Sequence, residues 1–183
     1  MACQGETIGV DMFSYFGPSE KHYTPPGGFC ISVFAFIRNG NRILLVRPAK
    51  HEKWTEWAPN WRGYSQEALD REMRSWRFPS SYVKIGEHPD MTLERVMGDQ
   101  LEIEEFRAGD FRLFNYYTPS RRYPGEMHWD YCFIYEVQTD ATPTTKPWLD
   151  AVDYIAIEQL KEEDFGSGQG GLLEIVKGTA DQR

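Results

Sequence analysis

Two apolar segments joined by a short turn constrain the fold more than any other feature of the sequence. FCISVFAFI (29–37) and RILLV (42–46) are rich in β-branched and aromatic residues. Between them lies RNGN (38–41), whose Asn-Gly pair is typical of a tight hairpin turn. Because both segments are almost continuously apolar, we expect a hairpin whose strands are buried on both faces.

The rest of the sequence predicts a layered domain around this hairpin. Further strands are expected at FRLFNYYT (111–118), DYCFIYEV (130–137) and DYIAI (153–157). A glycine-rich turn (166–171) precedes LLEIVKG (172–178), which predicts a short closing helix. Strands that alternate with two or three helices indicate an α+β fold with a mixed β-sheet.

Two segments differ from this pattern. Residues 1–28 are rich in turn formers and are interpreted as an N-terminal arm, laid over the domain or a partner subunit, or simply loose. Residues 49–75 are a polar, Trp-rich insertion that ends in a predicted helix with Ser65 as its N-cap. The chain from 29 to 183 is expected to form one domain that contains this insertion. The helix is expected to pack through an apolar stripe formed by Ala68, Leu69, Met73 and Trp76.

The overall charge argues against one class of partner. The chain of 183 residues has 20 basic and 28 acidic side chains, and its net charge is −8 at pH 7. A protein that binds nucleic-acid polymers needs a basic surface to displace counterions from phosphates. A small anionic ligand, held by a few arginines or by a metal ion, is compatible with this charge.

The cysteines and the N-terminus bear on the cellular compartment. Cys3, Cys30 and Cys132 match neither the spacing of a zinc site nor a disulfide framework. Cys30 and Cys132 lie in apolar segments, so we expect them to pack as small hydrophobic residues. The N-terminus lacks the basic region and long apolar stretch of a signal peptide, and no segment approaches the ~20 apolar residues of a membrane span. We therefore expect a cytoplasmic protein without a membrane partner.

The segment WRFPSSYVKIGEHPDMTLERVMGDQLEI, from Trp76 to Ile103, has the most specific spacing in the chain. A Trp-x-x-Pro lead-in precedes Gly86-Glu87, and Arg95 lies eight residues after Glu87. In this spacing the segment resembles the Nudix box of diphosphate hydrolases, which runs Gly, five residues, Glu, seven residues, Arg-Glu-apolar-x-Glu-Glu-x-Gly-apolar. The resemblance extends over residues 29–165 without 49–75, and it implies a Nudix-type α/β/α sandwich.

The resemblance implies a metal site on the helix of this segment. Three acidic positions at i, i+3 and i+4 would share one helix face and bind Mg²⁺, which takes oxygen ligands. Here these positions hold Val96, Asp99 and Gln100, so one acid of three is retained. We therefore expect Mg²⁺ (or Mn²⁺) to bind weakly through Asp99, with substrate phosphates completing its shell. Glu102 and Glu126 are candidates for additional ligands, although Glu102 also fits a solvated acid at a helix end.

Glu87 and Arg95 complete the catalytic set that the resemblance implies, together with Asp99. In that family the Glu–Arg pair ties the loop to the helix, so its role is structural. Ser81 stands at the first Gly of the pattern, where we expect its side chain to restrict the backbone. The helix should pack through an apolar stripe formed by Leu93, Val96, Met97 and Leu101.

Candidate substrate-binding residues lie outside the box. Arg121-Arg122 could bind a phosphate bidentately, although two solvated loop arginines are the commoner case. Trp57 belongs to an aromatic cluster that fits a stacking wall for a flat group, the insertion's own core, or a dimer contact. His128 and Asp130 follow Glu126, near the place where some Nudix proteins add a metal ligand or base, although His128 also fits an ordinary strand-edge residue.

These observations lead to two functional hypotheses. The first is a divergent Nudix-type hydrolase, weakly or unusually active, that cleaves a diphosphate linkage in a nucleoside diphosphate-like small molecule. The second is a catalytically inactive Nudix-like domain that binds a ligand or a protein. In both cases the partner is a small molecule or a protein rather than a nucleic-acid polymer, and the N-terminal arm is consistent with a homodimer. The sequence does not name the substrate, because loops and insertions set substrate choice on a given fold.

Overall fold

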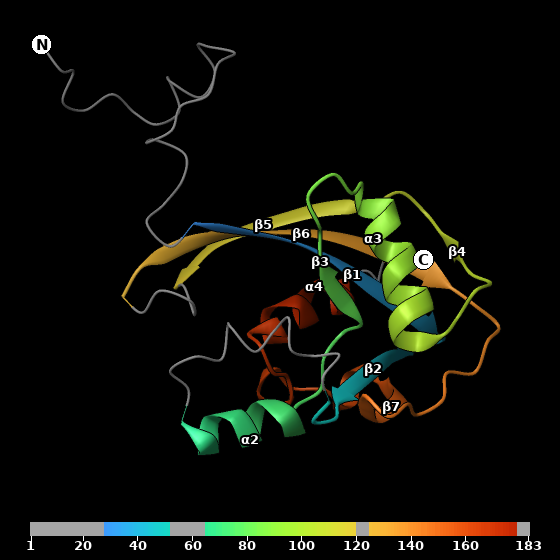
Figure 1. The fold of residues 1–183 in the computed structure, drawn as a ribbon. Coiled ribbons are helices and arrows are strands. Elements are labelled where there is room, and N and C mark those ends of the chain that lie inside the picture. The colour runs from blue at the N-terminus through green and yellow to red at the C-terminus, as the bar shows by residue number, and fades with distance from the viewer. Residues whose placement is uncertain (1–27, 52–64, 120–124, 179–183) are drawn as a thin grey trace, which may run out of the picture.

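The computed structural model describes residues 28–51, 65–119 and 125–178 (Figure 1). The predicted N-terminal arm and most of the Trp-rich insertion lie outside these residues. Within the described residues, no helix is both long enough and apolar enough to cross a membrane.

The predicted hairpin is present. Strand β1 (Phe29–Asn39) pairs antiparallel with β2 (Arg42–Pro48). Gly40 in the turn has φ +61°, a left-handed conformation that glycine adopts without steric cost. Six consecutive residues of β1 are buried, which confirms that this strand is covered on both faces.

A mixed sheet extends from both sides of the hairpin. Strand β7 (Leu149–Ala156) pairs antiparallel with β2, and β6 (Met127–Gln138) runs parallel to β1 along most of its length. Strand β5 (Arg112–Pro119) and the two-residue β4 (Arg107–Ala108) pair with β6. The short β3 (Ser80–Tyr82) pairs antiparallel with β1. The predicted mixed β-sheet is thereby confirmed.

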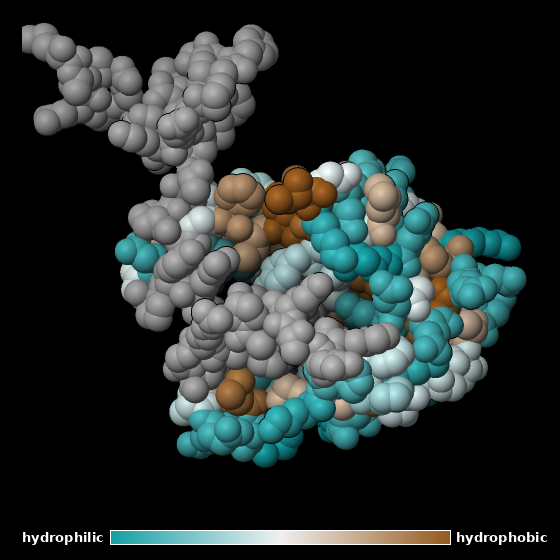
Figure 2. All heavy atoms as spheres, viewed as in Figure 1, coloured by the Kyte–Doolittle hydropathy of each residue, from teal (hydrophilic) through white to brown (hydrophobic). Residues whose placement is uncertain are grey.

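Helices and turns cover the two faces of this sheet, giving an α/β/α sandwich. On one face lies α3 (Pro89–Arg95), which continues directly into a π-helical turn, η3 (Val96–Gln100). On the other lie α4 (Leu173–Gly178) and the 3₁₀ turns η4 (Ile157–Gln159), η5 (Glu162–Asp164) and η6 (Gln169–Leu172) (Figure 1). Figure 2 shows mostly hydrophilic residues over α3, although Met91 is 53% exposed. Thr92 and Leu93 are the buried residues of this helix. The predicted α+β fold with Nudix-type layers is confirmed.

Each face of the sheet has its own hydrophobic core. Alternate residues of one strand point to opposite faces, so Val33 and Tyr135 pack toward α3 whereas Phe34 and Ile134 pack toward α4. The predicted apolar stripe of α3 is confirmed, because its four members are at most 3% exposed: Leu93, Val96, Met97 and Leu101.

Helix α2 (Gln66–Arg74) ends the insertion, and a polar contact holds it on the domain. Ser65 caps it as predicted, accepting a hydrogen bond from the Ala68 amide at 3.2 Å. Its most buried side chain is Glu72, which is 9% exposed and accepts a hydrogen bond from Arg77 Nη2 at 3.1 Å. The Ser167 amide donates to the same carboxylate at 2.7 Å. The expected apolar stripe is only half-buried, so the ion pair is the more enclosed contact.

Replacing Glu72 with Ala is expected to lower the free energy of unfolding by about 3–5 kcal/mol, because the guanidinium of Arg77 loses its buried counter-charge. Urea denaturation followed by circular dichroism measures this loss. Arg71→Ala, one residue away and exposed, is the matched control and should change stability by less than about 0.5 kcal/mol. Equal effects of the two substitutions would show that the ion pair does not hold α2.

Candidate functional site

The loop between β3 and α3 is shaped by its own sequence. Gly86 has φ +85°, which lets the chain reverse into the helix. His88 caps α3 by accepting a hydrogen bond from the Asp90 amide at 3.3 Å, and Pro89 occupies the first turn, where no intrahelical donor is needed. The loop and helix therefore begin at a fixed point on the sheet.

Glu87 and Arg95 form the most connected polar contact of this segment, as the resemblance implied. Arg95 Nε and Nη2 donate to the two carboxylate oxygens of Glu87 at 3.1 and 2.8 Å, so the pair is bidentate. Glu87 also accepts hydrogen bonds from the Lys84 amide at 3.0 Å and from Thr92 Oγ1 at 2.7 Å. The hydrogen bonds from Arg95, Lys84 and Thr92 lower the pKa of Glu87 from 4.5 to about 2. The loop is thereby tied to the helix at both of its ends.

Arg95 also reaches strand β3. Its Nη1 donates to Ser81 Oγ at 2.6 Å, and its Nη2 donates to the Tyr82 carbonyl at 2.8 Å. Ser81 lies in a strand, and it is not among the residues with positive φ. The expectation that Ser81 would disturb a glycine-specific backbone is wrong, because its backbone pairs with β1 and its hydroxyl gains a charged partner.

Two of the three positions implied for metal binding face inward. Val96 is 0% exposed and belongs to the hydrophobic core on the α3 side of the sheet. Gln100 is partly buried, and its Nε2 donates to the Ser80 carbonyl at 2.6 Å. The main-chain oxygen of Gln100 accepts a hydrogen bond from Trp148 Nε1 at 3.0 Å. Neither side chain presents a charged oxygen to solvent.

Asp99, the third position, is exposed within the π-helical turn. A π-helix forms i→i+5 hydrogen bonds and turns more slowly than an α-helix, so its residues depart from the regular i, i+3, i+4 face. Among the described residues, no hydrogen bond or ion pair holds the Asp99 carboxylate. It is therefore available to a cation or to a metal-bound ligand.

Glu102 ends the helix and is engaged elsewhere. Its carboxylate forms an ion pair with Lys146. Its φ is +54°, a left-handed conformation at the position where the Nudix pattern has Gly. Such a conformation is uncommon for residues other than Gly. With an ammonium group beside it, Glu102 is a poor ligand for a second cation.

Of the remaining predicted site residues, the structure describes Glu126. Glu126 is exposed and precedes β6. Gln100 donates a hydrogen bond to the Ser80 carbonyl. Ser80 and Ile134 of β6 are both aligned with the same residue of β1, one on each side of that strand. Ile134 lies eight residues beyond Glu126, and a strand advances about 3.3 Å per residue, so Glu126 is roughly 25 Å from Ile134 along β6. Trp57, Arg121 and Arg122 lie outside the described residues.

Sequence reasoning missed one contact that fixes the start of α3. The hydroxyl of Tyr135 in β6 donates a hydrogen bond to Asp90 in the first turn of the helix. Burial, and then the bond to the Asp90 carboxylate, raise the pKa of Tyr135 above its ordinary value of 10. A tyrosine at an inward position of a central strand, opposite an acidic helix start, is the signal that would have found this contact.

The described donor set does not fit a resident Mg²⁺ ion. Such an ion needs oxygen ligands, and it gives up its own waters reluctantly. At this helix, Asp99 supplies one unengaged carboxylate, while Val96 is in the core, Gln100 is bonded to the backbone, and Glu102 is paired with Lys146. One carboxylate can still meet an ion that arrives already bound to phosphate oxygens.

Comparison with solved structures defines the fold. The chain is similar to the E. coli ORF135 protein, with a TM-score of 0.58 and 16% identity over 91% of this chain and 98% of that one. It is similar to a MutT Nudix hydrolase from Burkholderia pseudomallei, with a TM-score of 0.54 and 15% identity over 80% and 96%. A dihydroneopterin triphosphate pyrophosphohydrolase of E. coli gives a TM-score of 0.53 and 11% identity over 84% and 96%.

These likenesses are structural. No family model matches the sequence, and no curated protein matches it. At identities of 11–16% the three structures establish a shared architecture, and this chain therefore has the fold of the Nudix hydrolases.

Replacing Glu87 with Gln tests the tie between loop and helix through its pH dependence. A carboxylate whose pKa falls from 4.5 to about 2 on folding stabilises the protein above pH 4.5, and this stabilisation is lost as the pH falls toward 2. The substitution should therefore lower stability at neutral pH and flatten the loss of stability below pH 4.5. Urea denaturation across this range measures both effects.

The matched control for this prediction is Glu94→Gln, an exposed acid on the same helix. Its pH profile should follow that of the parent protein. An unchanged profile in the Glu87→Gln protein would contradict the assigned role of the pair.

Proposed function

We propose that this chain is a divergent Nudix-type hydrolase that acts slowly on the diphosphate linkage of a nucleoside diphosphate-like small molecule. Three observations support the proposal: the fold, the bidentate Glu87–Arg95 tie, and the exposed carboxylate of Asp99 at an acidic position of the box. The exposed carboxylate of Asp99 carries the proposal, because Asp99 is the acid among the three metal positions of the box and no contact with the described residues engages it.

In this proposal the divalent ion arrives with the substrate. A diphosphate chelates Mg²⁺ or Mn²⁺ through its own oxygens and neutralises part of the charge on both partners. Asp99 then adds one protein oxygen and orients the complex against the helix, while Glu87 and Arg95 hold the loop that borders it. Arg121, Arg122 and Trp57 remain predicted contacts for the phosphates and for a flat group of the substrate.

A second function is favoured by a specific observation. Val96 is fully in the core, and Gln100 is bonded to Ser80, so the helix is built for packing at two of its three metal positions. This arrangement suits a domain that binds a diphosphate ligand, or a protein, without cleaving it. Homodimer formation and a cytoplasmic location remain predictions under either function.

An activity screen separates the two functions. The protein is incubated with a panel of nucleoside diphosphate derivatives and Mg²⁺ or Mn²⁺, and release of phosphate or nucleotide is followed. We expect slow turnover that falls at least about tenfold in Asp99→Asn, because a charged contact contributes about 1.5–3 kcal/mol. Glu94→Gln, an exposed acid on the same helix, should retain the parent rate.

The outcomes of this screen are distinct. Turnover that persists in Asp99→Asn would overturn the site assignment. An absence of turnover, combined with ligand binding that does not require a metal ion, would overturn the hydrolase proposal in favour of the binding domain.

A further inference from the structure

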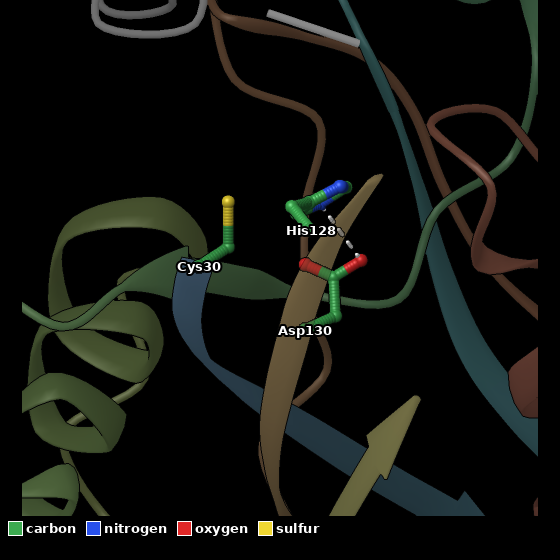
Figure 3. Close-up of side chains that lie close together, drawn as sticks. All are labelled: Cys30, His128 and Asp130. Atoms are coloured by element: carbon green, nitrogen blue, oxygen red, sulfur yellow. Dashed lines mark ion pairs between the residues drawn. The ribbon is translucent and has the colours of Figure 1, made fainter. Parts of the chain in front are cut away.

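Three side chains with metal-binding atoms meet where β1 and β6 begin (Figure 3). They are Cys30 of β1 and His128 and Asp130 of β6, and their donor atoms all lie within 4.8 Å of one another. The Nε2 atom of His128 lies 3.3 Å from Oδ2 of Asp130. Cys30 is 98 residues from His128 along the chain, so strand pairing alone brings them together.

The register of the sheet explains this meeting. Cys30 is aligned with Asp130 across the parallel β1–β6 pair. Because alternate residues of a strand share a face, Cys30, His128 and Asp130 lie on the same face as Phe34 and Ile134, the face covered by α4. The Nudix helix α3 packs on the opposite face. The cluster is therefore separate from the site at Asp99.

We propose that Cys30, His128 and Asp130 bind one divalent ion of the zinc class. A thiolate, an imidazole and a carboxylate are the ligand types of tetrahedral zinc sites, and the soft sulfur disfavours Mg²⁺. With bonds of about 2.0–2.3 Å, two ligand atoms on a tetrahedral zinc ion lie about 3.3–3.7 Å apart. The His128–Asp130 distance of 3.3 Å already meets this requirement. Because all three donor atoms lie within 4.8 Å of one another, the Cys30 sulfur needs a shift of at most about 1 Å to reach these ligand distances.

The backbone around the cluster is held from both sides. Strand β6 lies between β1 and β5, so His128 and Asp130 have paired neighbours: His128 with Thr118, and Asp130 with Tyr116 and Cys30. The Trp129 amide also donates to the Gly28 carbonyl at 3.2 Å, which fixes the chain where it enters β1. A site on paired strands is positioned more accurately than one on loops.

The ion would join the beginnings of two strands that are distant in sequence. Three protein ligands leave one coordination position for water or another ligand atom, as in open zinc sites. His128 is 7% exposed, so its imidazole is shielded from solvent, while Cys30 and Asp130 are partly exposed. The proposal does not depend on the hydrolase assignment, because neither Asp99 nor a phosphate takes part.

Cobalt titration of the full-length reduced protein tests the site without any activity measurement. Co²⁺ occupies zinc sites, and a bound thiolate produces a sulfur-to-cobalt charge-transfer absorption in the near ultraviolet. We expect this absorption at one equivalent of Co²⁺, its disappearance on addition of Zn²⁺, and a higher melting temperature with Zn²⁺. Asp130→Asn should weaken cobalt affinity more than about tenfold, the lower limit for loss of a supporting group.

The chain offers a matched control for the thiol. Cys132 lies on the same face of β6 but is 1% exposed within the core, so Cys132→Ser should retain the absorption, as should Cys3→Ser. Cys30→Ser, at a partly exposed position, should keep the fold by circular dichroism and lose the absorption. Absence of the band from the parent protein, or its persistence in Cys30→Ser, would overturn the proposal.

Discussion

The bidentate pair between Glu87 and Arg95 is the contact on which the arrangement of the Nudix segment depends. It closes the loop that follows β3, and Arg95 extends the connection to Ser81 and the Tyr82 carbonyl. The same helix is fixed on its inner side by an apolar stripe and at its start by Tyr135. These contacts hold the loop and helix in place without any metal ion.

This chain departs from the Nudix box pattern on the side of the helix that would meet a metal-bound diphosphate. Val96 adds to the core, and Gln100 donates its amide to a main-chain carbonyl that an anionic side chain at this position could not approach favourably. Glu102 has φ +54° and pairs with Lys146. Val96, Gln100 and Glu102 each have a partner within the protein, whereas Asp99 keeps an exposed carboxylate.

The sequence predicted the elements whose signal is local, and it missed those that depend on distant partners. Continuous apolar runs located five strands, and the resemblance to the Nudix box implied the contact between Glu87 and Arg95. Strands β3 and β4 are short and become strands by pairing with β1 and β6. The π-helical turn and the bond from Gln100 to Ser80 arise from packing. Cys132 is buried as expected, whereas Cys30 lies beside His128 and Asp130, a contact that local cysteine spacing does not reveal.

The described residues of this helix keep the Glu87–Arg95 tie, and their donor set does not fit a resident Mg²⁺ ion. Mn²⁺ is a paramagnetic substitute for Mg²⁺, and its binding to the unliganded protein is measured directly by electron paramagnetic resonance, in the parent protein and in Asp99→Asn. We expect the unliganded parent protein to bind Mn²⁺ weakly, with a clear increase in Mn²⁺ binding when a diphosphate compound is added. Tight uptake of Mn²⁺ without that compound, abolished by Asp99→Asn, would contradict this expectation.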